Sequence, residues 1–453
     1  MSTAGAAPGR IEELLAAERA RFAATHPKAM EFRDQAGRSM LSGVPMNWMT
    51  RWASPAPIVA ACAHGAQVED IDGHHYVDLC LGDTGAMAGH APAPVATAVA
   101  GQMNRGATFM LPTEDSLWVA DEMSRRFGMT RWQFCLTATD ANRFVLRLAR
   151  EITGRPMIMV HNWCYHGSVD ETLATLGTSG TVTARHGSVG PALDVSQATR
   201  VVEINDIDGL ERALADRTVA CVLVEPALTN IGIVLPESGY HEELRRLTRE
   251  VGTLLVIDET HTICAGPGGY TSRENLQPDF LTIGKTIGGG IPVAAYGMTD
   301  DVAARVVAST YWPEADVGGV GGTLAGNPLS MAAVRATLGQ VLTDQAFASM
   351  ESLAVRFTDG VTSVIDRRGL PWHVTRLGCR SEYLFTPQRP RTGAEAATAG
   401  DAHLDALLHL ALLNRGILLT PFHNMALMSP ATTAEQVDAH TRAFEEITDE
   451  LLR

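Results

Sequence analysis

Two acids and a lysine follow short apolar runs in the middle of the chain. Asp258 and Glu259 end the run TLLVIDE, and Lys285 follows LTIG and precedes a glycine cluster. In open parallel sheets, ligands collect at the carboxyl ends of the strands. A lysine held among small residues at such an edge can act as a nucleophile. The pattern therefore predicts a site in which Lys285 forms a covalent bond and a carboxylate stands nearby.

This combination matches the needs of pyridoxal phosphate (PLP). The cofactor takes a lysine for its Schiff base and a carboxylate beside its pyridine nitrogen, and we assign these roles to Lys285 and Asp258. Its phosphate needs hydroxyls and free backbone N–H groups at a helix start. The stretch CLTATDANRF offers both, because an apolar run ends there and Thr137, Ala138 and Thr139 lead into a helical pattern.

The same residues allow two other interpretations. Asp258, Glu259 and His261 are possible metal ligands and would suit a metal-dependent hydrolase. Consecutive strand residues point to opposite faces, however, so the two acids do not face one ion without distortion. The tripeptide GKT at 284–286 is similar to the end of an ATP-binding loop, but apolar strand precedes it. We expect no metal site, and we expect His261 to be a hydrogen-bonded structural residue.

The segments around these residues alternate short apolar runs with amphipathic stretches such as GLERALADR and HEELRRLTREVG. Strands that are apolar on both faces and alternate with helices indicate a parallel sheet covered on both sides. The sequence therefore predicts an α/β fold with a mostly parallel central sheet. The runs expected to form strands are 131–137, 157–162, 200–205, 219–226, 253–259, 281–284 and 293–298.

The two ends of the chain have a different character. Residues 11–22 show helical periodicity, and AQVEDIDGHHYVDLC alternates around Asp72-Gly73, which predicts a β-hairpin. Helix and mixed strand follow residue 340, with a loop or lid at 386–402 and a helix at 401–415. The predicted domains are an N-terminal part of a small domain at 1–95, a large domain at 96–344 and a C-terminal part of the small domain at 345–453.

Composition narrows the function classes. The 453 residues carry a formal net charge of −15, which argues against a nucleic-acid partner. Seven scattered cysteines without a C-x-x-C spacing favour free thiols in a reducing cytoplasm. The N-terminus lacks a secretory pattern, and no apolar run reaches the roughly 18 residues of a membrane helix. We expect a cytoplasmic enzyme that binds neither nucleic acid nor membrane.

Six segments appear in a fixed order: Thr137-Ala138-Thr139-Asp140-Ala141, Tyr165-His166-Gly167, Glu225-Pro226 with Asn230, Asp258-Glu259-Thr260, Lys285 in GKTIGGGIP, and GTLAGNP with Thr323. Together they make the chain similar to the class III (fold type I) PLP-dependent aminotransferases, and within them to the glutamate-1-semialdehyde aminomutase branch. The resemblance is clearest over residues 40–345. It implies a large PLP-binding domain, a smaller α/β domain built from both chain ends, and a homodimer.

The resemblance also implies roles for single residues. Tyr165 would stack on the pyridine ring, and Thr323 would reach the phosphate from the partner subunit. Ala138 replaces the family's glycine and Thr260 its valine, and these departures bear on the substrate rather than the cofactor. The residues expected to line the cofactor are Thr137, Ala138, Thr139, Tyr165, His166, Glu225, Asn230, Asp258, Thr260, Lys285 and Thr323.

The expected activity is that of a transaminase, which moves an amino group between an amino acid or amine and an oxo acid or aldehyde through an aldimine on Lys285. The alternative is a PLP-dependent isomerase, either an aminomutase or an amino-acid racemase, because it would use the same cofactor residues. For the substrate we name Trp48, Arg51, Arg380 and His423, since either arginine could bind a carboxylate through two hydrogen bonds.

Overall fold

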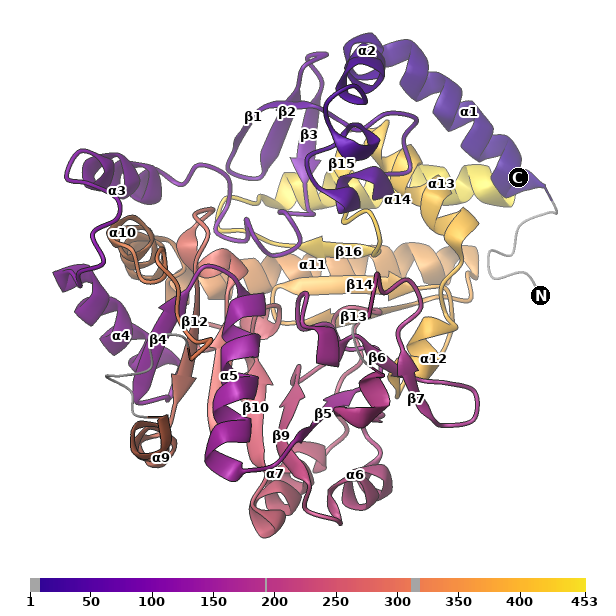
Figure 1. The fold of residues 1–453 in the computed structure, drawn as a ribbon. Coiled ribbons are helices and arrows are strands. Elements are labelled where there is room, and N and C mark those ends of the chain that lie inside the picture. The colour runs from indigo at the N-terminus through magenta and orange to yellow at the C-terminus, as the bar shows by residue number, and fades with distance from the viewer. Residues whose placement is uncertain (1–8, 192–193, 311–317) are drawn as a thin grey trace. The chain divides into compact units, whose positions relative to one another are not determined.

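The computed structural model describes residues 9–191, 194–310 and 318–453, which fold into two compact units (Figure 1). Unit 1 combines the chain up to Pro92 with Gln345–Arg389 and Ala399–Arg453, so it contains segments from both halves of the sequence. Unit 2 comprises Ala93–Asp344 and Pro390–Thr398. Each unit has its own sheets and helices.

Unit 2 is built on a sheet whose described strands follow the order β4-β12-β11-β10-β9-β5-β8. Neighbouring strands are parallel except at β12, which runs antiparallel to both β11 and β4. Every residue of β9, β10, β11 and β12 is buried, as a sheet covered on both faces requires. The predicted α/β fold with a mostly parallel sheet is therefore confirmed. The strands are β4 Arg131–Cys135, β5 Met157–His161, β8 Thr199–Val202, β9 Val219–Val224, β10 Leu254–Asp258, β11 Phe280–Ile283 and β12 Ala294–Met298.

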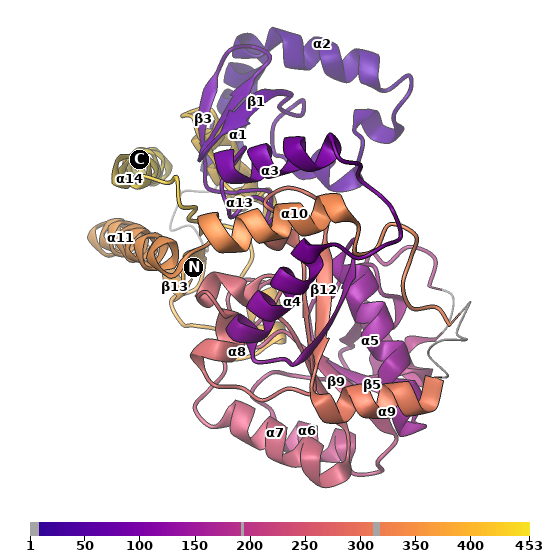
Figure 2. The ribbon, with the colours of Figure 1, turned by 90° about the vertical axis from the view of Figure 1, so that its left-hand side faces the viewer.

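Amphipathic helices cover this sheet, with α5 and α9 on one side and α6, α7 and α8 on the other (Figure 2). Helix α7 shows why they pack there, since it buries Leu244 and Leu247 while exposing Glu242 and Arg246. The elements of unit 2 besides the large sheet are α3 Ala93–Met103, α4 Glu114–Phe127, α5 Ala138–Thr153, β6 Ala174–Leu176, β7 Val182–Ala184, α6 Ile207–Leu214, α7 Tyr240–Val251, α8 Gly269–Arg273, α9 Asp300–Thr310, α10 Pro328–Ala336 and α12 Gly393–Ala397.

Unit 1 joins distant parts of the chain in one sheet, because β15 pairs in parallel with β3 in the order β1-β2-β3-β15. The hairpin predicted around Asp72-Gly73 is present as β2 and β3. A second sheet has the order β13-β14-β16. The elements are α1 Arg10–Thr25, α2 Pro27–Ala36, β1 Ala60–His64, β2 Gln67–Asp70, β3 His75–Asp78, α11 Asp344–Arg368, β13 His373–Leu377, β14 Arg380–Leu384, α13 Ala402–Leu413, β15 Ile417–Leu418, β16 Met425–Leu427 and α14 Ala434–Leu452.

The segment 386–402 departs from the predicted loop or lid because it contains α12. Thr392 caps this helix by accepting the N–H of Glu395 at 3.1 Å. The segment is also tied down, since the Arg391 carbonyl accepts from Asn205 at 2.8 Å and the Gly393 N–H donates to a carboxylate of unit 2 at 2.9 Å.

Two findings bear on the expectations from composition. All seven cysteines are free thiols, and Cys62 is the exposed one. None of the helices in the described ranges has the length and apolar character needed to cross a membrane.

Candidate active site

Polar side chains lie at the edge of the unit 2 sheet where its parallel strands end. β10 ends at Asp258, whose register partner in the parallel strand β11 is Thr282, and Lys285 follows β11 directly. β9 leads to Glu225 and β5 leads to Tyr165. β4 ends at the same edge as β11, because β12 runs antiparallel to both. The structure thus gathers side chains from sequence positions more than a hundred residues apart.

Asp258 is buried and bound by three donors. Its Oδ2 accepts from Asn142 Nδ2 and from His166 Nδ1, both at 2.9 Å, and its Oδ1 accepts from the N–H of Thr260 at 3.0 Å. Burial alone would raise the pKa of Asp258, but the hydrogen bonds and the positive charge of His166 lower this pKa to about 2. Asp258 is therefore an anion at neutral pH, as a partner for a protonated pyridine nitrogen must be.

His166 and Asn142 are buried with Asp258 in one polar network. Burial would lower the pKa of His166, but Cys164 and Asp258 raise it well above the usual value, so the imidazole is a cation. Asn142 has a fixed orientation because its Oδ1 accepts from Thr282 Oγ1 at 2.7 Å while its Nδ2 also donates to the His166 carbonyl at 3.1 Å. Sequence reasoning missed Asn142, although an amide on the buried face of an amphipathic helix was a usable signal.

Lys285 has a strained backbone and an immediate polar neighbour. Its φ of 52° lies in the left-handed region, which costs a non-glycine residue about 1–3 kcal/mol and is found chiefly at functional sites. The side chain is half-buried, and its Nζ lies 2.7 Å from Nε2 of His261. His261, expected to be structural, thus contacts the predicted nucleophile. Only the folded chain reveals this contact, because the two residues follow different strands.

Glu259 engages a different set of groups from Asp258. It accepts from the hydroxyl of Thr262 at 2.6 Å and from the backbone N–H groups of Tyr270 and Thr271 in α8. Burial raises the pKa of Glu259, whereas the pKa of Asp258 is lowered. Because the two acids have separate partners and His261 contacts Lys285, the three possible metal ligands do not converge. The structure gives the metal-dependent hydrolase no support.

Helix α5 begins at this edge with an arrangement suited to a phosphate. Thr137 is its N-cap, in an extended conformation, and its hydroxyl accepts a backbone N–H at 3.1 Å. Ala138 is the first helical residue, so the substitution of glycine causes no strain here. The Thr139 hydroxyl accepts from the N–H of Ser168 at 3.1 Å, and a Cβ on Gly167 would lie only 2.1 Å from that hydroxyl. Hydroxyls and free N–H groups at a helix start are what a phosphate binds.

Glu225 fixes the loop that carries Tyr165. Its buried carboxylate accepts from the N–H of Tyr165 at 3.2 Å and from the N–H of Thr229 at 3.1 Å, and burial raises its pKa. Tyr165 itself is half-buried. Asn230, from the same segment as Glu225, turns its amide oxygen to the guanidinium of Arg185 at 2.7 Å. Glu225 and Asn230 therefore act on protein groups in this structure.

The residues at this edge fit PLP. They include a half-buried lysine amine, an anionic carboxylate and the start of a helix with two hydroxyls. In addition, the buried hydroxyl of Thr260 has no hydrogen-bond partner among the described residues. Such a group is rare in native structures, and a ligand bound beside it would satisfy it.

Of the other predicted contact residues, Thr323 belongs to unit 2 and the rest belong to unit 1. Thr323 is exposed in the turn before α10, and its reach into a partner subunit stays a prediction. Trp48 and Arg51 belong to unit 1 and gather around Phe422. The Arg51 guanidinium lies 5.5 Å from the centre of the Phe422 ring, and the Trp48 ring meets it edge-on at 5.8 Å. These residues form an aromatic and cationic cluster with an exposed arginine.

Arg380 and His423 also belong to unit 1, and both face Glu382. Arg380 is fully buried, with Nη2 3.5 Å from Glu382 Oε2, and His423 Nδ1 lies 3.1 Å from Glu382 Oε1. The charge of Arg380 is thus already opposed by a carboxylate. Of the two predicted arginines, Arg51 is the one that is open to a small anion.

Comparison with known proteins gives consistent results. Residues 48–448 match the family described as aminotransferase class-III. A glutamate-1-semialdehyde 2,1-aminomutase of Desulfitobacterium hafniense is 34% identical over 387 residues, covering 84% of this chain and 88% of that protein. A solved glutamate-1-semialdehyde-aminomutase from Pseudomonas aeruginosa PAO1 has 48% identity and a TM-score of 0.97, covering 99% of this chain and 100% of that one. An omega-transaminase from Sphaerobacter thermophilus has 29% identity and a TM-score of 0.85, covering 93% and 97%.

Proposed function

Because the chain belongs to the class III aminotransferase family, we propose that it is a PLP-dependent enzyme that moves an amino group within one small substrate, as an aminomutase does. This is the isomerase alternative, which the similarity to named aminomutases supports better than the transaminase expected first. The cofactor predicted from the sequence agrees with the family and with a variant of the Pseudomonas protein that was solved in complex with PMP.

The observation that carries the proposal is the buried ion pair of Asp258 and His166 at the sheet edge where Lys285 also lies. When bound, PLP supplies an electron sink that stabilises the charge left when a substrate C–H bond breaks. Asp258 holds a fixed negative charge for the ring nitrogen because His166 and Asn142 keep it ionised and oriented. The start of α5 and its threonine hydroxyls would hold the phosphate of the cofactor.

Lys285 Nζ is the base in this proposal. It takes a proton from one substrate carbon and returns a proton nearby, which is general acid–base catalysis by a positioned amine. His261 Nε2, at 2.7 Å, holds the amine in place and shares a proton with it. The left-handed backbone of Lys285 fixes the direction from which its side chain leaves the strand.

A transaminase is the second candidate, favoured by the similarity to the omega-transaminase from Sphaerobacter thermophilus. The two reactions use the same cofactor residues and differ in where the amino group ends. A transaminase gives the amino group to a second molecule, an oxo acid or aldehyde, so it needs an acceptor to turn over. An aminomutase keeps the amino group in one carbon skeleton and needs no acceptor.

The test is therefore which product a single substrate gives. The purified PLP-loaded enzyme is incubated with excess glutamate-1-semialdehyde alone, and the products are separated by chromatography and quantified by mass spectrometry. An aminomutase converts the whole substrate pool into an isomer of equal mass. A transaminase passes the amino group from one substrate molecule to the aldehyde of another, and it gives a diamino and a dioxo product whose masses differ from that of the substrate.

Lys285→Ala is the control, since it should abolish both outcomes while the protein remains folded. Accumulation of the diamino and dioxo products in place of the isomer would reject the aminomutase in favour of the transaminase. Purified enzyme that neither retains PLP nor shows an absorbance change with any amine would reject the proposal as a whole.

A further inference from the structure

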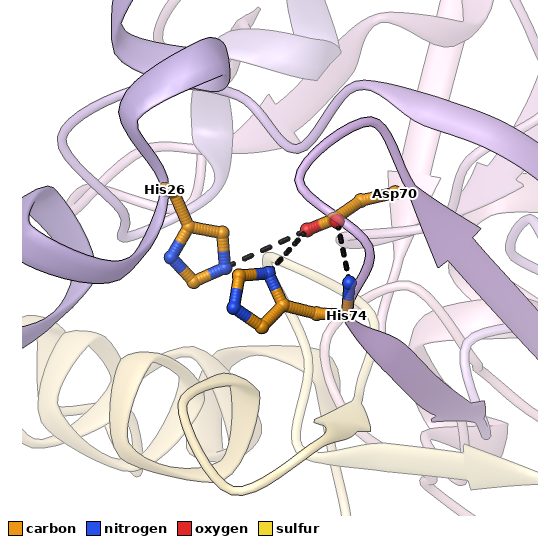
Figure 3. Close-up of side chains that lie close together, drawn as sticks. All are labelled: His26, Asp70 and His74. Atoms are coloured by element: carbon orange, nitrogen blue, oxygen red, sulfur yellow. Dashed lines mark hydrogen bonds and ion pairs between the residues drawn. The ribbon is translucent and has the colours of Figure 1, made fainter.

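Three side chains of unit 1 converge outside the candidate active site. His26 lies between α1 and α2, Asp70 ends β2, and His74 lies in the turn before β3. The nearest nitrogen of each imidazole and one carboxylate oxygen lie within 4.8 Å of one another. Figure 3 shows both rings directed at the carboxylate of Asp70. His26 and Asp70 are buried, and His74 is about one-third exposed, with 37% of its side chain accessible, so solvent reaches one side of the group.

The carboxylate and one ring have fixed orientations. Asp70 Oδ1 accepts from the N–H groups of Asp72 and His74, both at 2.9 Å, which leaves Oδ2 for the two imidazoles. His26 Nδ1 lies 3.0 Å from the carbonyl oxygen of Phe22 and 2.9 Å from the hydroxyl oxygen of Thr25, and because a carbonyl only accepts, we assign the ring hydrogen to Nδ1. In the neutral ring, Nε2 then carries no hydrogen, and its lone pair is directed at Asp70. Metal-binding histidines have this arrangement, with the second nitrogen donating to a backbone carbonyl.

The group is short of one proton. Tyr76 Oη lies 2.8 Å from His26 Nε2 and 2.7 Å from Asp70 Oδ2, but its single hydrogen serves only one of these two acceptors. The His26 ring is buried, stacked on Phe22 at 4.0 Å and packed against the ring of His74 at 4.2 Å. A cation between the two lone pairs would satisfy both.

Of the two imidazole–carboxylate separations, one is a long hydrogen bond and the other exceeds hydrogen-bond range, and both suit ligands around one ion. Asp70 Oδ2 lies 3.2 Å from His74 Nδ1 and 3.6 Å from His26 Nε2. Charge-assisted N–H···O bonds are shorter, at about 2.7–2.9 Å, and 3.6 Å is no hydrogen bond. Around a tetrahedral Zn²⁺ with bonds of about 2.0–2.1 Å, neighbouring ligand atoms are about 3.3–3.4 Å apart. The two observed separations lie on either side of that value.

We propose that His26, Asp70 and His74 form a binding site for a divalent transition-metal ion, of which Zn²⁺ fits best. Two imidazole nitrogens and one carboxylate oxygen are a common donor set for this ion, and a water or Tyr76 Oη takes the fourth position. The ion joins the α1–α2 corner to the β2–β3 hairpin. Asp72, in the hairpin turn, already caps α2 through the N–H groups of Lys28 and Ala29. The metal is therefore structural, and its site is independent of the proposed reaction.

The test uses untagged, PLP-loaded protein after treatment with a chelator. Co²⁺ is titrated in as the probe, and its visible absorption reports four-coordinate binding, while metal analysis gives the stoichiometry. Three variants are compared in a Cys62→Ser background, because Cys62 is an exposed thiol and would bind Co²⁺ itself. They are His74→Ala, Asp70→Asn and the control His75→Ala, whose histidine is adjacent in sequence and exposed.

The parent and His75→Ala should bind one Co²⁺ per chain, which Zn²⁺ displaces, and the ion should raise the midpoint of thermal unfolding. His74→Ala and Asp70→Asn should weaken Co²⁺ binding by more than about 10-fold and lose the thermal shift. If Asp70→Asn fails to fold, His74→Ala still tests the proposal, because the side chain of His74 is about one-third exposed. No stoichiometric binding in the parent, or equal binding in His74→Ala, would overturn the proposal.

Discussion

The ion pair of His166 and Asp258 can be tested by its energy and by its pH dependence. The substitution that tests it is His166→Leu, which keeps a side chain of similar size but removes the positive charge. A pKa lowered from 3.8 to about 2 corresponds to about 2.4 kcal/mol in favour of ionised Asp258. Removing one member of a buried pair costs about 3–5 kcal/mol, because the other charge stays buried without its partner. We expect His166→Leu to lower the free energy of unfolding by about 2–5 kcal/mol at pH 6.

The pH profile follows from the direction of each pKa shift. The raised pKa of His166 contributes stability that is complete below the unfolded value of 6.5 and is lost as pH rises through the folded pKa. The lowered pKa of Asp258 contributes stability above 3.8 that is lost as pH falls toward 2. The deficit of His166→Leu should therefore be largest between about pH 4 and 6.5. Above pH 6.5 it should shrink by up to about 1.4 kcal/mol per pH unit.

His161→Leu is the matched control, because His161 is also fully buried but bonds to Tyr240 at 2.7 Å and faces no carboxylate. Burial lowers its pKa to about 3, so the native protein with His161 loses stability as pH falls below 6.5. The deficit of His161→Leu should be constant above pH 6.5 and shrink below it, opposite to that of His166→Leu. Urea unfolding of both cofactor-free variants and the parent, from pH 4 to pH 9, measures this. Parallel profiles for the two variants would refute the assignment of an imidazolium to His166.

Three further outcomes are expected. Gly167→Ala should lower stability and PLP affinity more than Gly154→Ala does. Both glycines have a positive φ, at which an alanine costs about 1–2 kcal/mol, but only at Gly167 would the added Cβ also meet a side chain. Urea unfolding and PLP titration measure the two losses, and equal losses would contradict this. His261→Ala should slow the proton transfer by about 10-fold or more and shift the pH profile of its rate. His261→Gln should recover part of the rate, because glutamine keeps a hydrogen bond to Lys285. Single-turnover kinetics measure these rates, and an unchanged rate in His261→Ala would contradict the prediction. Burial raises the pKa of Asp405 to about 6, so ionisation of this carboxyl lowers the stability of the fold as pH rises from 3.8 through 6. Asp405→Asn should therefore be more stable than the parent at pH 7 but not at pH 4. Melting curves at both pH values test this, and no gain at pH 7 would count against it.

Much of unit 2 could be predicted because its strands are apolar on both faces. The runs 219–226 and 253–259 contain β9 and β10, every residue of which is buried. The direction of β12 could not be read, since an apolar run indicates a strand but not its orientation. Helix α12 was missed in a segment interpreted as a loop, although Thr392 and Glu395 have the spacing of an N-terminal cap.

The site shows the same division between local and distant information. The roles of Asp258 and Lys285 could be predicted from the sequence, because each lies at the end of an apolar strand, where ligands collect. The contacts that set their protonation were not predicted, because His166 lies in the loop after β5, Asn142 lies on α5, and His261 reaches Lys285 from the loop after β10. A motif identifies a reactive residue, whereas the protonation state of that residue depends on neighbours that only folding brings together.

The three buried acids at the sheet edge illustrate this dependence. Burial raises the pKa of Glu225 and of Glu259, while Asp258 has its pKa lowered to about 2. All three accept backbone N–H groups, but only Asp258 also bonds to the imidazolium of His166. Strand alternation keeps Glu259 away from that cation, although it is the next residue in the chain. Asp258 is therefore the acid of the three whose ionised form the protein stabilises most, so a cofactor with a cationic ring nitrogen has a charged partner there.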